Sequence, residues 1–158
     1  MFKTKPNLVE HLLRLAVRGD EDEIELQQRA AFQHVLASTN ADTLLDRLAE
    51  FAEAVQRRSW DVLEIVRGAA ASDPALAELY EQRQRARHAN QKTIAYRLQE
   101  LGAIPYGTSA DAVADLLWLY TSADIYRMLT IERRWSPARY RAWFRSAVAS
   151  ALTSPIPP

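Results

Sequence analysis

The chain of 158 residues contains no cysteine, which excludes disulfide frameworks, thiolate catalysis and zinc sites built on cysteine. Its three histidines, His11, His34 and His88, are too scattered to form a cage of histidine ligands. Four glycines and seven prolines leave the interior nearly free of helix breakers, because three of the prolines stand in the last four residues. We therefore expect long helices, no metal site and no cofactor.

Charge of one sign is also lacking, because 20 lysines and arginines balance 20 aspartates and glutamates. Nucleic-acid binding relies on clustered cations, so a chain without net positive charge is a poor DNA binder by itself. No run approaches the roughly 18 uncharged apolar residues of a membrane helix, and residues 1–6 lack the apolar core of a signal peptide. These absences predict a cytoplasmic protein with no membrane partner.

Sequence patterns of common enzyme sites are missing as well. A di-iron site of the ferritin type needs a glutamate three residues before a histidine. The residues at those places are Leu8, Ala31 and Arg85. The chain has no glycine-rich phosphate-binding loop, since its glycines are Gly19, Gly68, Gly102 and Gly107, and neither a His-Glu-x-x-His nor a Gly-x-Ser-x-Gly motif occurs. The sequence therefore predicts no catalytic residues and a protein that is not an enzyme.

What the sequence does contain is apolar residues at helical spacing almost throughout, with no run that alternates as a strand does. A chain of this length is large enough to bury one core. We predict a single all-α domain of about seven helices. The predicted segments are 7–17, a short helix within 26–36, 40–59, 60–72, 74–101, 110–121, a segment ending at 131, and 137–152.

Capping residues mark several of these helix ends. The candidate N-caps are Asn7, Asn40, Asp73, Ser109 and Ser136. Pro74 and Pro137 directly follow two of them and suit a first turn, where the missing N–H costs nothing. Gly102 fits the position just after a helix. Ser59 is predicted to break the helical pattern, and Ser122 either kinks a helix or begins a new one.

The helix predicted at 74–101 has a polar gap in its core-facing stripe. The stripe is apolar at both ends, but in its middle it passes through Arg83, Arg87, Asn90 and Gln91. Either the helix leaves the core there and these groups are solvated, or the stretch borders a cavity in which polar groups bind a ligand. A buried Arg87 would need an anionic ligand or a carboxylate partner. The candidate carboxylates are Glu50, Glu53 and Glu64.

Aromatic residues on several predicted helices could wall such a cavity, although each of them could equally be ordinary core. His88 lies beside the polar stripe, and we expect it at the surface or behind the ligand rather than as a ligand itself. The pattern predicts an apolar cavity for a small hydrophobic or anionic effector. The predicted wall residues are Phe51, Val55, Trp60, Leu63 and Trp118, and the predicted polar points are Arg87, Gln91 and Tyr96.

The last two long helices are apolar around more of their circumference than one buried stripe requires. Two explanations fit the pattern equally. The helices are buried inside the single chain, or they form a four-helix interface with a second copy related by a two-fold axis. The residues predicted for such a dimer interface are Val113, Leu116, Leu117, Tyr120, Trp143, Ala147 and Ala151.

Several segments, in their order and spacing, resemble the C-terminal half of TetR-type transcriptional regulators. They are AAASDPALA at 69–77, LGAI at 101–104, ADLLWLYTS at 114–122, IYR at 125–127 and RRWSPARYRAW at 133–143. The segment FKTKPNL at 2–8 resembles the end of that family's DNA-binding region, where it leads into the linking helix. The resemblance covers nearly the whole chain.

The resemblance implies a ligand-binding and dimerisation domain at 19–153. It assigns 1–18 to the linking helix and the remnant of the DNA-binding region, with Lys5 at a DNA phosphate, and leaves 154–158 as a disordered tail. The family's helix-turn-helix would lie before Phe2, so DNA would be bound only through a part that this chain lacks. The N-terminal arm offers only Lys3 and Lys5 to DNA, and two cations cannot supply the base contacts that specificity requires. We therefore expect that residues 1–158 alone do not bind DNA sequence-specifically.

In such a regulator, ligand binding would favour one placement of the 7–17 helix and so control DNA binding by the intact protein. The alternative function is an interaction protein without a DNA-binding head, which forms mixed dimers with full-length regulators. A small helical lyase or isomerase is a third and weaker interpretation.

Overall fold

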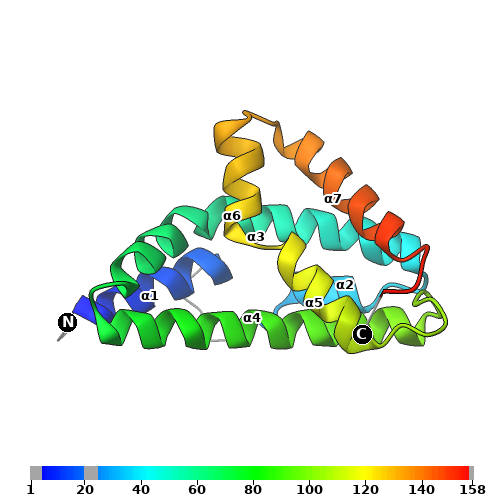
Figure 1. The fold of residues 1–158 in the computed structure, drawn as a ribbon, viewed down its shortest axis with the longest axis horizontal. Coiled ribbons are helices and arrows are strands. Elements are labelled where there is room, and N and C mark those ends of the chain that lie inside the picture. Colours follow the sequence, from blue (N-terminus) through cyan, green and yellow to red (C-terminus); the bar gives the residue numbers. More distant parts are fainter. Residues whose placement is uncertain (1–4, 20–24, 157–158) are drawn as a thin grey trace.

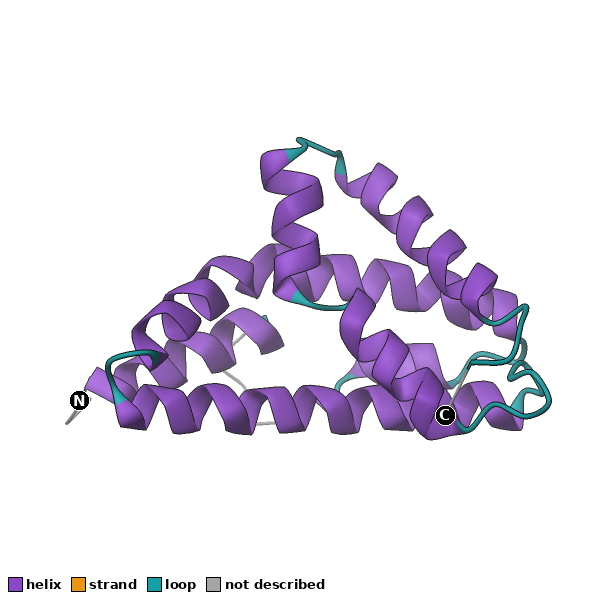
Figure 2. Cartoon of the chain, viewed as in Figure 1, coloured by secondary structure: helices purple, strands orange, loops and turns teal. Residues whose placement is uncertain are grey.

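The computed structural model of the chain describes residues 5–19 and 25–156. Every regular element within these residues is helical and no strand occurs among them, which confirms the all-α prediction (Figures 1 and 2). The described part contains seven α-helices: α1 (Lys5–Arg18), α2 (Ala30–Leu36), α3 (Ala41–Ala70), α4 (Pro74–Glu100), α5 (Ala110–Tyr120), α6 (Ala123–Tyr126) and α7 (Pro137–Ala151). Two shorter elements are the 3₁₀ turn η1 (Leu26–Gln28) and the π-helical segment η2 (Arg127–Glu132).

The two longest helices, α3 and α4, run in opposite directions from a tight turn at 71–73 (Figure 1). The helix α1 packs against α3 near that turn, and α5 packs across the far half of α4. The chain then rises through α6 and η2 and returns along α7, which packs on the first half of α3. The α3–α4 pair is therefore the frame on which all the other helices lie.

Most helix ends lie where the capping residues predict them. Oδ1 of Asp73 accepts hydrogen bonds from two N–H groups of the first turn of α4, at 3.1 and 3.3 Å. Ser122 accepts a hydrogen bond from the N–H of Ile125 at 3.2 Å, so a new helix begins there and α5 is not merely kinked. Gly102 follows α4 at a φ of +68°, a conformation that side chains with a Cβ avoid.

The predicted break at Ser59 is wrong, because α3 continues through it to Ala70. The hydroxyl of Ser59 donates to the carbonyl of Val55, one turn earlier, at 2.8 Å. This buried polar group is therefore satisfied inside its own helix and does not end it. Such back-bonding tends to bend helices, and α3 is visibly curved (Figure 1).

Two smaller boundaries also differ from the prediction. The helix α1 already begins at Lys5, so Asn7 lies inside it and is not its N-cap. The short helix predicted within 26–36 is divided into η1 and α2, and Arg29 between them has an extended backbone. Residues 1–4 of the predicted N-terminal segment and residues 157–158 of the predicted tail lie outside the described residues.

The core lies where α2, α3, α4, α5 and α7 meet. Phe32 of α2 packs edge-on against Phe51 of α3, with 5.6 Å between the ring centroids. Each large apolar side chain buried here contributes roughly 1.5–3 kcal/mol. The buried members are Phe32, Val35, Leu44, Leu45, Leu48, Ala49, Ala52, Ile94, Ala95, Leu98, Ala110, Val113, Ala114, Leu117, Phe144 and Val148.

The C-terminal segment returns to this core. Ile156, within the predicted tail, packs against the core cluster, and its N–H donates to Oγ1 of Thr108 at 2.9 Å. Across the described ranges, no helix combines the length and the apolar character that crossing a bilayer would require.

Two leucines of α5 allow a paired test of the core. Leu117 is fully buried and Leu119 is 52% exposed. Replacing Leu117 with alanine removes buried methyl groups and leaves a cavity, so we expect a loss of about 2–5 kcal/mol in the free energy of unfolding. The control Leu119→Ala should change it by less than about 0.5 kcal/mol. Urea denaturation measures both, and equal effects would contradict this placement of α5.

Candidate functional site

A cavity of about 440 Å³ lies between α3 and α4, closed at one end by α1 and η1. Its volume falls within the usual range of about 300–1,000 Å³ for small-molecule sites. Most of its wall is apolar. Phe51, Val55 and Leu63 of α3 contribute to it, as the sequence predicted, and so do Val17 of α1 and Leu26 of η1.

The polar gap of α4 lies on this cavity. Arg83, Arg87, Asn90 and Gln91 all line it, and Gln91 is buried, with 7% of its surface exposed. The stretch therefore borders a cavity, and the alternative in which α4 simply turns these groups to bulk solvent is wrong. The amide Oδ1 of Asn90 accepts a hydrogen bond from Gln27 of η1 at 2.9 Å, which ties η1 to this part of α4.

The guanidinium of Arg87 lies at the junction of α4 and α5. Its Nη1 donates to the carbonyl of Trp118 and to Oγ1 of Thr121, the latter at 3.1 Å. Its Nε and Nη2 both donate to Oε1 of Gln84, at 3.2 and 3.0 Å. These bonds use four of the five N–H groups of an arginine. The group also stacks on the ring of Trp118, 4.5 Å from its centroid.

Arg87 is a cation whose charge no nearby carboxylate neutralises. No carboxylate among residues 5–19 and 25–156 forms an ion pair with it. Burial removes water from the guanidinium and lowers the pKa of Arg87 to about 10, an effect that the more distant Asp124 and Tyr80 partly oppose. The group is still protonated at neutral pH, so the wall of the cavity carries a partly desolvated positive charge.

The three carboxylates considered as partners of Arg87 serve elsewhere. Glu53 is buried and is paired with Arg57 at 3.0 Å and with Arg141 at 3.5 Å. Glu64 accepts a hydrogen bond from Arg67, which lowers the pKa of its carboxyl. Glu50 is exposed. The negative end of α5 takes the place of a carboxylate for Arg87, because the last carbonyls of a helix lack partners within it.

Two buried glutamines lie in the same wall. Nε2 of Gln56 donates to the carbonyl of Thr121, which fixes the orientation of its amide because a carbonyl only accepts. Its Oε1 has no hydrogen-bond partner among the described residues, and neither has Oε1 of Gln91. Buried polar atoms are usually paired, so these oxygens are candidate contacts for a bound molecule.

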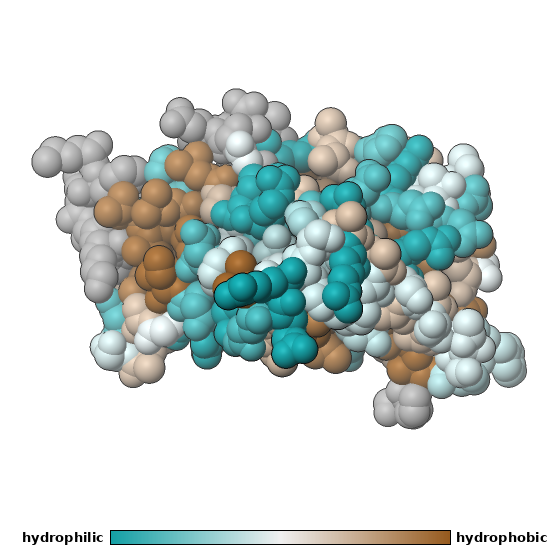
Figure 3. Space-filling view, turned by 90° about the horizontal axis from the view of Figure 1, so that it is seen from above, coloured by the Kyte–Doolittle hydropathy of each residue, from teal (hydrophilic) through white to brown (hydrophobic). Residues whose placement is uncertain are grey.

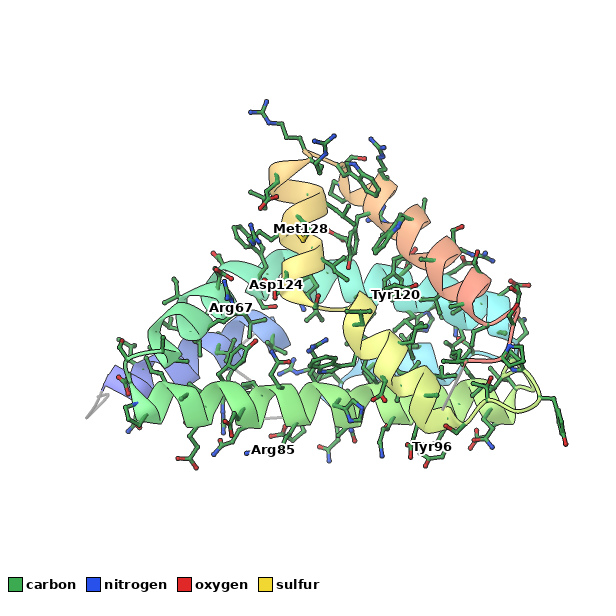
Figure 4. The ribbon with its side chains drawn as sticks, viewed as in Figure 1. Arg67, Arg85, Tyr96, Tyr120, Asp124 and Met128 are labelled. Carbon is green, nitrogen blue, oxygen red and sulfur yellow. The ribbon has the colours of Figure 1, made fainter. Side chains whose placement is uncertain are left out.

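The structure does not bring all the predicted pocket residues together. Trp118 does not line this cavity and lies instead on a second, smaller one next to it. Trp60 lies outside the wall, and Tyr96 is 51% exposed on the outer side of α4 (Figure 4). His88 is at the surface, where its Nε2 lies 2.7 Å from Oδ1 of Asp115.

Sequence reasoning missed several wall residues. Ser59 of α3 was interpreted as a helix break and not as a wall residue, and Gln56 was missed because it interrupts an otherwise apolar stripe by only one residue. Ser59 lies four residues from both Val55 and Leu63, and Gln56 lies three residues before Ser59, so this helical spacing was the available signal. The other missed members are Val17, Glu25, Leu26, Gln27, Gln28, Phe32, Leu48, Ala52, Ala86, Ala89 and Thr121.

The predicted dimer residues fall into two groups. Val113 and Leu117 have no exposed surface in the single chain, so they belong to its core and cannot form an outer interface. The side chain of Tyr120 packs edge-on against Trp143 at 5.9 Å, which links α5 to α7. The partly exposed members are Leu116, Tyr120, Trp143, Ala147 and Ala151. The side chain of Lys5, predicted at a DNA phosphate, lies outside the described part of the chain.

Within the described residues, no group of three or more histidine, cysteine, aspartate or glutamate side chains is placed to hold a metal ion. Comparisons of this chain with protein-family models, curated proteins and solved structures give no match. The function is therefore argued from the site.

Replacement of Arg87 by methionine tests its place at the end of α5. The variant loses its charge-assisted hydrogen bonds, and because one such bond is worth about 1.5–3 kcal/mol, we expect the free energy of unfolding to fall by at least that amount. The matched control is Arg85→Met on the outer side of α4, where Arg85 makes only an exposed 3.5 Å ion pair with Glu81. Similar urea midpoints for the two variants would show that the junction contributes nothing.

Proposed function

We propose that the chain is the effector-binding and homodimerisation domain of a TetR-like transcriptional regulator. The observation that carries the proposal is the largely apolar cavity between α3 and α4, with the buried amides of Gln56 and Gln91 and the partly buried Arg87 in its wall. An apolar wall with a few convergent polar groups is typical of a small-molecule site. The sequence resemblance supplies the regulatory context.

A route from the cavity to the N-terminal helix supports this proposal. Val17, near the end of α1, lines the cavity. Arg58 of α3 donates to the carbonyls of Ala16 and Val17 at 3.3 Å each, so the end of α1 is held against the same helix that walls the cavity. A ligand that contacts Val17 more closely in one placement of α1 would shift the population toward that placement.

The outer surface of α1 supports the same context. Leu8 and Leu12 of α1 are 40% and 46% exposed, and Ile65 of the neighbouring α3 segment is 65% exposed. Viewed from above, the middle of this face is hydrophilic and a hydrophobic patch lies toward the end that holds α1 (Figure 3). An exposed apolar surface next to the proposed linking helix suits packing against another domain or chain.

We also propose a two-fold dimer through the outer faces of α5 and α7. Ala147→Glu would place a charge in that interface and should convert the dimer to monomers. The control is Ala138→Glu, nine residues earlier on the same helix and therefore on its opposite face. Light scattering at micromolar concentration measures both variants. A wild-type protein that is monomeric there would contradict the dimer.

Filling the cavity tests the effector site. Val55→Trp places an indole in the wall and should weaken binding of the fluorescent probe 1-anilinonaphthalene-8-sulfonate at least about ten-fold, the effect of losing roughly 1.4 kcal/mol of contacts. The control is Val62→Trp, on the same helix but on neither cavity. Fluorescence titration gives the dissociation constants, with circular dichroism to show that both variants fold. If Val55→Trp bound the probe as tightly as the wild type, this cavity would not be the binding site.

A further inference from the structure

A second cavity of about 230 Å³ adjoins the first, between the later part of α3, the first half of α4 and the start of α6. The two cavities share part of their walls, namely Gln56, Leu63, Arg83 and Arg87. They are therefore neighbouring chambers separated by these side chains. Together they still fall within the range of volumes typical of a single small-molecule site.

The smaller chamber differs in character from the larger one. Three arginines line it, Arg67, Arg83 and Arg87, against the two carboxylates of Glu64 and Asp124. Arg67 and Asp124 lie toward one another from α3 and α6, above α4 (Figure 4). Glu64 is engaged by Arg67, with Nε donating to Oε2 at 3.0 Å. Charged side chains of both signs therefore line this chamber, whereas the larger chamber is mostly apolar.

Hydrogen-bond donors without acceptors occur at the boundary between the chambers. Nε1 of Trp118, whose side chain lines the smaller chamber, is buried and has no partner among the residues described. Arg87 stacks on the same indole and keeps one Nη2 N–H that no described residue accepts. An anionic group bound here would compensate the desolvated cation and offer acceptors to these donors.

We infer that the effector is an amphipathic molecule with one anionic head, a carboxylate or a phosphate, bound in the smaller chamber against Arg87 and Trp118. Its apolar body extends into the larger chamber, past Leu63 and Val55. This inference rests on the proposed function, because it names the chemical class of ligand for that cavity. A neutral apolar molecule would fill the larger chamber but leave the donors at its boundary unpaired.

Decanoate and decanol test the inference, because they share one apolar chain and differ in the head group. Isothermal titration calorimetry of the full chain at pH 7.5, below the concentration at which decanoate forms micelles, should give decanoate at least about ten-fold tighter binding. Arg87→Gln should abolish this advantage, because it should weaken decanoate binding at least about ten-fold more than it weakens decanol binding. Arg85→Gln, the same substitution on the outer side of α4, should keep the advantage.

Trp118→Phe is the second variant, because it removes the indole N–H but keeps an aromatic ring under Arg87. It should reduce the advantage of decanoate several-fold, and it keeps the test decisive if Arg87→Gln does not fold in thermal melts. Equal binding of the two probes by the wild type, or an advantage that survives both variants, would overturn the anionic head. Failure of the wild type to bind either probe would also overturn it. The proposed binding site itself is tested independently by the effect of Val55→Trp on binding of the fluorescent probe, so the anionic head can fail while the cavity remains a binding site.

Discussion

The C-terminal end of α5 is the point at which the walls of both cavities are joined. Two carbonyls there, those of Trp118 and Thr121, lie at the end of the helix, where the helix itself offers no further partners. Arg87 from α4 donates to the first and Gln56 from α3 to the second. The two long helices are thus held to one helix end by side chains that also line the cavity. A packed apolar junction would have closed this space, whereas polar side chains bridge it and leave room beside them.

Arg87 has two roles at this junction. Its hydrogen bonds to α5 stabilise the fold, while its burial without a carboxylate leaves a charge that a bound anion would compensate. In the proposed regulator, occupancy of the cavity by an anion would therefore alter the electrostatics of the same junction that stabilises the fold. Arg58 holds the end of α1, including the cavity residue Val17, against α3, and in the proposed regulator these contacts would relate the ligand to the N-terminal helix.

Local signals in the sequence were sufficient for most helix boundaries. Asp73 with Pro74, Ser109, and Ser136 with Pro137 each cap a helix where predicted, because capping depends on neighbouring residues alone. The helix break predicted at Ser59 was wrong because a serine hydroxyl can also donate to a carbonyl one turn earlier in its own helix, as Ser59 does to Val55. Whether a serine ends a helix or continues it depends on its burial, which the local sequence does not show. The polar gap of α4 pointed to the cavity because the spacing of apolar residues identifies the face of a helix that is buried. Polar residues that interrupt such a face therefore lie where the core has a space.

The remaining details of the site depend on contacts between distant segments. Gln56 meets Thr121 across 65 positions of sequence, which no local pattern indicates. Tyr96 was assigned to the cavity although it lies next to the buried Ala95, because one residue along a helix turns a side chain by about 100°. Val113 and Leu117 were assigned to a dimer interface because an apolar face does not reveal whether its partner is the same chain or another.

The most direct test of the central claim is native mass spectrometry of the chain after incubation with a small-molecule extract of the cells that make it. The account predicts that the wild-type protein retains an additional mass, lost on denaturation, and that the Val55→Trp variant does not retain it. The retained molecule should carry an acidic group. A wild-type protein that keeps only the mass of its own chain, or a variant that retains as much as the wild type, would contradict the claim.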